Sequence, residues 1–181
     1  MVKEIISEVT QEKFELLKTK DVENVKNGST EKIYLELDNT KGDTEIAINT
    51  AEYFSKSESD LVINIIGDLS PAGVLLAAIG EPKFRIADKK ATFRLGDANK
   101  YSADATEKDL TSEDRELFEI LSAITKERDL ILEKIISGDV FDAYTARDLN
   151  IVDVVPSYDD KYKRRRKRNK SNNSAKVNTV E

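Results

Sequence analysis

The sequence predicts an α/β domain built on a parallel sheet, followed by a basic tail. Apolar residues alternate along 33–37 and return in the continuous apolar run 61–80, with a helix-like segment between them. A strand, a helix and a strand in this order favour a right-handed parallel unit. The composition then changes after Pro156. We therefore expect one domain over residues 1–156 and a disordered tail over residues 157–181.

The charge of the chain is unevenly distributed. The net charge is −6, but residues 157–181 hold nine Lys and Arg against three Asp and Glu. The tail therefore carries +6 and the remainder of the chain −12. A segment this polar and this charged cannot bury enough apolar surface to fold by itself.

The absence of two residue types restricts the chemistry. The 181 residues include no cysteine and no histidine. Without cysteine there is no disulfide or thiolate, and without histidine the usual general base near neutral pH and the commonest metal ligand are missing. The glycines match no phosphate-binding or dinucleotide-binding loop. We expect no metal and no cofactor.

Neither the N-terminus nor the apolar run is typical of a membrane or secreted protein. The first residues lack the basic-then-apolar pattern of a signal peptide, and Asn64, Asp68 and Pro71 interrupt the run 61–80. We expect a soluble, cytoplasmic protein without a membrane partner.

The first half of the chain is predicted from its periodicity and its capping residues. Val2 to Val9 has a β-like pattern, Thr10 is placed to cap a helix, and Asn27-Gly28 is placed to end it. Residues 33–37 alternate as a half-buried strand does, and 38–43 are rich in turn residues. The expected elements are a strand over 2–9, a helix over 11–27, a strand over 33–37, a turn over 38–43 and a helix over 45–54.

The apolar run 61–80 is the centre of the prediction. It begins with β-branched residues, turns through 67–73 and continues with helix formers over 74–79. We interpret it as a buried strand, a tight turn and a buried helix. In several α/β enzyme folds such a corner presents a nucleophile, and backbone N–H groups at the helix start are available to an oxyanion.

The second half is expected to be mixed. Thr111-Ser112-Glu113-Asp114 is typical of a helix N-terminus, and Ser137-Gly138 of a helix end. The expected elements are strands over 83–87 and 91–95, a surface excursion over 96–110, a helix from 111 that is interrupted at 126–129 and ends at 138, a short helix over 143–149 and a last strand over 151–156.

Three motifs in this order resemble those of the proteolytic subunit of the Clp protease (ClpP) in the ClpP/crotonase superfamily. Residues 33–42 (IYLELDNTKG) lie over the family's "IYLYINSPGG". Residues 67–81 lie over "GxAASMGAFLLAAGE", and residues 141–153 resemble the closing "hxSAxEAxxxGLID". The resemblance covers residues 3–155. It implies a ClpP/crotonase-like fold of repeated β-β-α units, with a parallel sheet and flanking helices.

The resemblance does not extend to the catalytic residues. The family's nucleophilic serine falls on Pro71, its histidine on Gly96 and its aspartate at or near Gly138. A shifted alignment would place the serine and aspartate roles on Ser70 and Asp139, one position away, but it would not supply the base. The oxyanion-loop positions correspond to Lys41 and Gly42, with Ala72 at the helix start. Because triad catalysis needs nucleophile, base and orienter together, the resemblance implies a pseudoenzyme that lacks the serine-protease triad.

Several functions remain open at this point. The kept fold implies a non-catalytic ring subunit or assembly component, as a homo-oligomer or in a mixed ring with a ClpP-like subunit. The handle segment, which carries ring-to-ring contact in the family, is shorter here, and this puts a double ring in doubt. A ClpP/crotonase fold used for an unrelated purpose is the plainer alternative.

A second hypothesis is that the chain is still an enzyme. Ser70 lies one position from the expected serine, and Lys41 is the lysine that the resemblance brings near it, so the two are candidates for a serine-lysine hydrolase. The plainer reading is that Ser70 and Pro71 open the buried helix, because serine at the N-cap before proline is a common helix start.

The basic tail suggests a third hypothesis for the function. A basic tail can bind nucleic acid or another polyanion through its phosphates, or remain solvated, or fold back on the acidic body. Only Tyr162 interleaves the charges, so we expect any nucleic-acid binding to be independent of sequence. The candidate polyanion-binding residues are Lys161, Lys163, Arg164, Arg165, Arg166, Lys167, Arg168 and Lys170.

Overall fold

The computed structural model describes residues 3–28 and 31–156. The predicted tail, 157–181, and all of its candidate residues lie outside this part of the chain. In chain order the elements are β1 (Lys3–Val9), α1 (Gln11–Lys26), β2 (Ile33–Gly42), α2 (Thr44–Phe54), β3 (Leu61–Ile65), α3 (Pro71–Ala78), β4 (Arg85–Ala87), β5 (Thr92–Phe93), the 3₁₀ helix η1 (Glu107–Asp109), α4 (Ser112–Thr125), α5 (Arg128–Ser137), β6 (Phe141–Asp142) and α6 (Ala143–Asp148).

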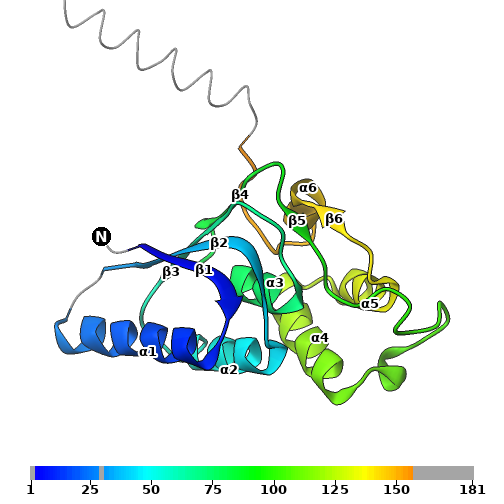
Figure 1. Cartoon of the computed structure of the whole chain (residues 1–181), viewed down its shortest axis with the longest axis horizontal. Coiled ribbons are helices and arrows are strands. Elements are labelled where there is room, and N and C mark those ends of the chain that lie inside the picture. Colours follow the sequence, from blue (N-terminus) through cyan, green and yellow to red (C-terminus); the bar gives the residue numbers. More distant parts are fainter. Residues whose placement is uncertain (1–2, 29–30, 157–181) are drawn as a thin grey trace, which may run out of the picture.

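The predicted α/β class is confirmed. Four strands form one sheet in the order β1-β2-β3-β4, and every pair in it is parallel. Figure 1 shows α1 and α2 side by side along one face of this sheet, with α3 and α4 continuing the helical layer. The α1 helix starts as predicted, because the Thr10 side chain accepts a hydrogen bond from the Lys13 N–H.

Alternation along the strands separates a buried face from an open one. Leu35 and Leu37 of β2 and Ile63 and Ile65 of β3 are at most 1% exposed and pack under the helices. The residues between them point to the other face, where Ile5 of β1 is 56% exposed. Within residues 3–28 and 31–156, the helices therefore cover one face of the parallel sheet and leave the other open.

The predicted turn at 38–43 is wrong, because β2 continues through it to Gly42. Glu8 and Val9 of β1 pair with Lys41 and Gly42, which keeps these turn-forming residues in the ladder. The register between β1 and β2 shifts between Ile6 and Glu8, and Asn39 has a positive φ of 48°. A bulge accommodates the polar residues that predicted a turn.

The turn in the apolar run is also shorter than predicted. The α3 helix begins at Pro71 rather than at Val74, since proline's fixed φ suits the first helical position. Seven of its eight residues, all except Pro71, are buried. The structure confirms a buried strand followed by a buried helix and leaves residues 66–70 to connect them.

The second half contains one further correction. No strand forms over 151–156; only a single parallel bridge joins Val154 to Ile86 of β4. The short β5 pairs antiparallel with β6, away from the main sheet. Lys126 caps the end of α4 and Gly138 caps the end of α5, both in left-handed conformation, as the predicted interruption and the predicted C-cap require.

Candidate functional site

The corner between β3 and α3 holds the residues that sequence reasoning singled out. Ser70 is the N-cap of α3 and Pro71 is its first residue. The Ser70 N–H donates to the Thr40 carbonyl of β2 at 2.9 Å. The Ser70 hydroxyl makes no capping bond, and its oxygen is buried with no hydrogen-bond partner among the described residues. Ser70 therefore has the position of a helix start, and none of the described residues acts as a base to its hydroxyl.

Lys41 does not meet Ser70. It lies in β2, where it pairs with Glu8 of the edge strand, and its side chain is exposed. No ion pair or hydrogen bond joins it to any described residue of the corner. A serine-lysine pair needs a lysine in an apolar setting within hydrogen-bond reach of the hydroxyl. The structure does not bring the two candidate residues into that contact.

Gly42 is required for close packing of β1. Its φ is +126°, and a Cβ there would lie 2.6 Å from the carbonyl oxygen of Val9 and 2.7 Å from its nitrogen. The neighbouring Asp43 N–H donates to the same Val9 carbonyl at 3.3 Å. The loop position that the resemblance assigns to an oxyanion is therefore used to close the sheet edge.

Gly96 occupies the position that the resemblance assigns to the catalytic histidine. Gly96 is buried. A Cβ built on it would overlap the carbonyl oxygen of Ile135 and lie 2.9 Å from the carbonyl carbon of Ile135. These atoms belong to the backbone of Ile135, which cannot move aside as the end of a flexible side chain can. The space for any side chain at this position is taken by the last turn of α5.

Gly138, at the position assigned to the aspartate, is packed in the same way from the other side. Its φ is +64°, and a Cβ there would overlap the nitrogen of Ala98 and lie 2.5 Å from the carbonyl carbon of Asp97. The segments 96–98 and 135–138 thus approach each other backbone to backbone. Asp139, the neighbouring carboxylate, is exposed and outside this contact.

A polar network that the sequence did not indicate spans the turn in front of α3. The Thr92 hydroxyl donates to the Asp68 carboxylate at 2.6 Å, and the Asp68 N–H donates to the Asn39 side chain at 3.2 Å. The Leu69 N–H donates to the Thr92 carbonyl, and the Arg94 N–H to the Leu69 carbonyl. These bonds fix the corner to β5, and they offer no nucleophile with a base.

The open face of the sheet carries a mixed surface. Ile66 is 42% exposed, Phe84 38% and Val154 38%, around a polar centre in which Glu36 is ion-paired with Lys3 and accepts from Asn64 at 3.0 Å. The hydrogen bond from Lys3 lowers the pKa of Glu36. A parallel sheet is normally covered on both faces, so this one lacks its second layer in the described chain.

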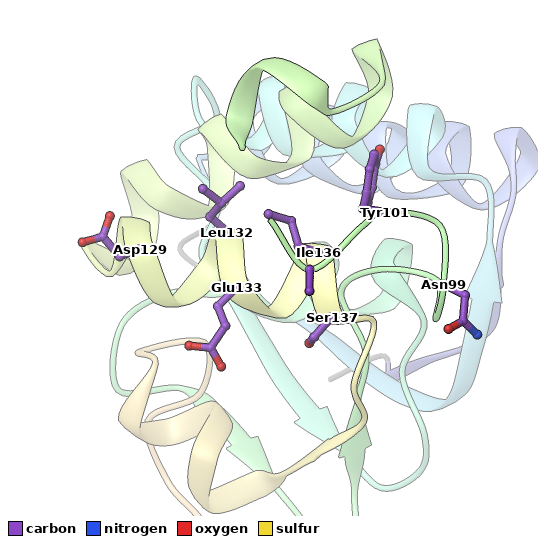
Figure 2. A pocket seen from close by; sticks show the side chains of 8 residues that line it. Asn99, Tyr101, Asp129, Leu132, Glu133, Ile136 and Ser137 are labelled. Carbon is purple, nitrogen blue, oxygen red and sulfur yellow. The ribbon is translucent and has the colours of Figure 1, made fainter. Parts of the chain in front are cut away.

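A separate cavity lies between α5 and the excursion that follows Gly96. Its volume is about 570 Å³, and Figure 2 shows Leu132 and Ile136 on α5 facing Tyr101. Asp129 and Glu133 lie at the other side of the cavity from Asn99. We call this cavity the α5 pocket. It is lined by Asn99, Tyr101, Ala103, Asp129, Leu132, Glu133, Ile136 and Ser137.

Solved structures of peptidases have the same fold. The ClpP protease catalytic domain from Plasmodium falciparum superposes with a TM-score of 0.69 at 16% identity, over 86% of this chain and 85% of that one. A peptidase from Plasmodium falciparum gives a TM-score of 0.68 at 17% identity, over 86% of this chain and 95% of that one. A third structure, described as an enzyme, superposes with a TM-score of 0.67 at 18% identity, over 86% of this chain and 95% of that one.

These likenesses confirm the ClpP-like fold that the three motifs predicted. By sequence the chain matches no family model and no curated protein. Among residues 3–28 and 31–156, no helix is both long and apolar enough to cross a membrane.

Proposed function

We propose that this chain is a catalytically inactive ClpP-like protein that acts as a non-catalytic ring subunit or assembly component. The observation that carries the proposal is the backbone contact between segments 96–98 and 135–138. It fills the positions of base and orienter, Gly96 and Gly138, with main chain. Since the sequence has no histidine at all, no rearrangement of this contact supplies the usual base.

The open sheet face supports a role in assembly. A parallel sheet with one uncovered face exposes apolar side chains that another protein surface would bury. The described chain leaves Ile5, Ile66 and Phe84 in this state. A homo-oligomer, or a mixed ring with a ClpP-like subunit, would provide the missing layer.

Two measurements on the full chain test the proposal. Labelling with an active-site fluorophosphonate and a peptide-hydrolysis assay should both be negative. Light scattering, alone and with a ClpP-type partner, should give a mass above that of the 20.4 kDa monomer. Robust turnover that Ser70→Ala abolishes would contradict the inactive function, and a monomer under both conditions would contradict the assembly role.

A hydrolase that uses Ser70 is the alternative enzyme. Its support is the buried hydroxyl without a partner at the start of a buried helix, where backbone N–H groups are available to an oxyanion. It requires Lys41 to leave the β2 surface and reach Ser70. Peptide hydrolysis that survives Lys41→Met would remove this lysine from consideration as the base.

Binding of nucleic acid or another polyanion through the basic tail is a further proposal. Eight Lys and Arg within 161–170 would contact phosphates and release counterions. Binding of an oligonucleotide to the full chain should fall steeply as salt rises. Replacing Arg164, Arg165 and Arg166 by Gln should weaken it; equal binding by that variant would contradict the proposal.

A further inference from the structure

The acidic charge of the folded domain is concentrated in its second half. Residues 97–148 hold fourteen Asp and Glu against seven Lys and Arg. Several of the cations are already engaged: Lys100 pairs with Asp114 at 2.6 Å, and Arg128 pairs with both Glu107 and Glu119. Over this stretch the carboxylates exceed the cations by seven, since fourteen stand against seven.

The α5 pocket lies in this acidic half and combines carboxylates with an apolar wall. Asp129 is exposed and has no ion-pair partner among the described residues, while Glu133 is 61% exposed and is 3.5 Å from Lys134. Leu132, Ile136 and the ring of Tyr101 form the wall. Such a surface fits the side chains of Lys and Arg, whose stems are apolar and whose heads are cationic.

Tyr101 is held in place for this role. Its hydroxyl donates to the Asp114 carboxylate and accepts from the Thr111 N–H at 3.0 Å. The Lys100 ammonium already lies 5.6 Å from the centroid of this ring, and contacts of this kind are favourable within about 6 Å. The two carboxylates on α5, Asp129 and Glu133, give the pocket a negative rim that is complementary to an incoming cationic side chain.

The basic segment 161–170 has the charge and the spacing that the pocket requires. Asp129 and Glu133 are four residues apart on one helix, so their Cβ atoms are about 6 Å apart. Alternate side chains of an extended strand are about 6.7 Å apart. Two arginines such as Arg164 and Arg166 can thus each meet one carboxylate while their stems cover Leu132 and Ile136.

The segment can also reach the pocket. The described chain ends at Pro156, and the eight residues from there to Arg164 and the ten to Arg166 span up to about 26 Å and about 33 Å when extended. A domain of this size has a radius of gyration of about 15 Å. The segment can therefore reach the surface on the side of the domain where the described chain ends, but not the far side.

We propose that the basic segment 161–170 docks in the α5 pocket of its own chain and that a polyanion must displace it to bind. The other cavities fit this occupant less well. The cavity beside Phe14 has Lys56 on its wall, and its Asp21 is hydrogen-bonded to Tyr53 and Ser57. The groove beside Phe54 is mainly apolar and is lined by Arg85.

Cross-linking of the full chain tests the docking directly. A carbodiimide joins amines to carboxylates that are in contact, and a mixture of isotopically light and heavy protein separates contacts within a copy from contacts between copies. We expect bonds from lysines of 161–170 to Asp129 or Glu133 within one copy. The proposal is wrong if these two carboxylates give no such bond, or if the bonds join only light to heavy chains.

The competition rests on the proposed polyanion binding, and a separate measurement tests it. The double variant Asp129→Asn with Glu133→Gln should bind a 20-nucleotide oligo(dT) about threefold to tenfold more tightly at low salt. The reason is that segment 161–170 is no longer held in the α5 pocket. The control Glu116→Gln with Asp139→Asn removes the same charge from exposed positions outside the pocket.

The two outcomes are distinguishable. Equal tightening in the control would show a long-range effect of net charge and overturn the competition. If the oligonucleotide binds to neither the parent chain nor the variant, polyanion binding and its competition both fail. The intramolecular cross-links would still decide the docking.

Discussion

Arg85 and Asp153 form a two-bond ion pair that joins β4 to the last described segment of the chain. Arg85 Nε donates to Asp153 Oδ2 at 2.9 Å, and Nη2 donates to Oδ1 at 2.6 Å. The same carboxylate accepts from the backbone N–H groups of Lys83 and Arg85. Arg85 Nη1 donates to the carbonyls of Ala78 and Asn150. One guanidinium therefore ties α3, β4 and the segment after α6 together.

The pair predicts a stability that depends on pH. Burial raises the pKa of Asp153, but the hydrogen bonds from Arg85 outweigh it, so the folded-state pKa lies below the ordinary value. A depressed folded pKa adds stability that is present above the unfolded pKa, near 3.9, and is lost as the pH falls through the folded value. We expect Asp153→Asn to lose about 3 kcal/mol of unfolding free energy at pH 7.

Unfolding by urea from pH 7 down to about pH 2 checks this prediction. The acid loss of stability should be smaller in Asp153→Asn than in the parent protein. Asp148→Asn is the control, because Asp148 is 72% exposed in its pair with Arg147. An unchanged acid profile in Asp153→Asn would mean that the pair does not carry the pH dependence.

Gly96→Ala should destabilise the fold strongly. The added methyl group meets the backbone of Ile135, which can move only with the end of α5. Overpacking against main chain predicts a loss of about 2 to 4 kcal/mol in unfolding free energy. Gly28→Ala is the comparison, since Gly28 has a φ of +59° and no atom within 4 Å of a Cβ. It should lose only about 1 kcal/mol, through backbone strain.

Ser70→Ala should leave stability nearly unchanged. Removing a helix N-cap ordinarily costs about 1 kcal/mol because a hydrogen bond to the helix is lost. Ser70 makes no such bond, and its buried hydroxyl has no partner to lose. Asp43→Ala is the matched variant: the Asp43 carboxylate accepts from the Ile46 N–H at 3.1 Å at the start of α2.

Thermal melting of the two variants compares the caps. We expect Asp43→Ala to lower the melting temperature and Ser70→Ala to change it by much less. A large loss in Ser70→Ala would reveal a bond of the Ser70 hydroxyl in solution and strengthen the hydrolase alternative.

Asp21 should be the polar anchor between α1 and α2. Asp21 is 5% exposed. Its carboxylate accepts hydrogen bonds from the Tyr53 hydroxyl at 2.8 Å and from the Ser57 hydroxyl at 2.5 Å. Asp21→Ala leaves both hydroxyls without their acceptor and should cost about 2 kcal/mol. Tyr53→Phe removes one donor and should cost about 1 kcal/mol. Hydrogen exchange along α1 should accelerate more in the first variant; equal exchange in both would contradict an anchoring role.

The sequence predicted the elements whose signals are local. Thr10 and Thr111 accept bonds from the N–H groups of Lys13 and Asp114 at the starts of α1 and α4, and Gly138 caps α5 with a positive φ. The alternating apolar residues of β2 and the run 61–80 also fixed which segments are buried. Each of these signals is read within a few residues of chain, so periodicity and capping chemistry suffice.

Only the tertiary structure decided how distant segments meet. The turn residues 38–42 became strand because Glu8 and Val9 lie beside them, whereas 151–156 formed no strand beyond the single bridge from Val154 to Ile86. The sequence established that there is no histidine; it could not show that Ile135 fills the space beside Gly96. Packing between segments about forty residues apart depends on the whole fold, which local propensity does not contain.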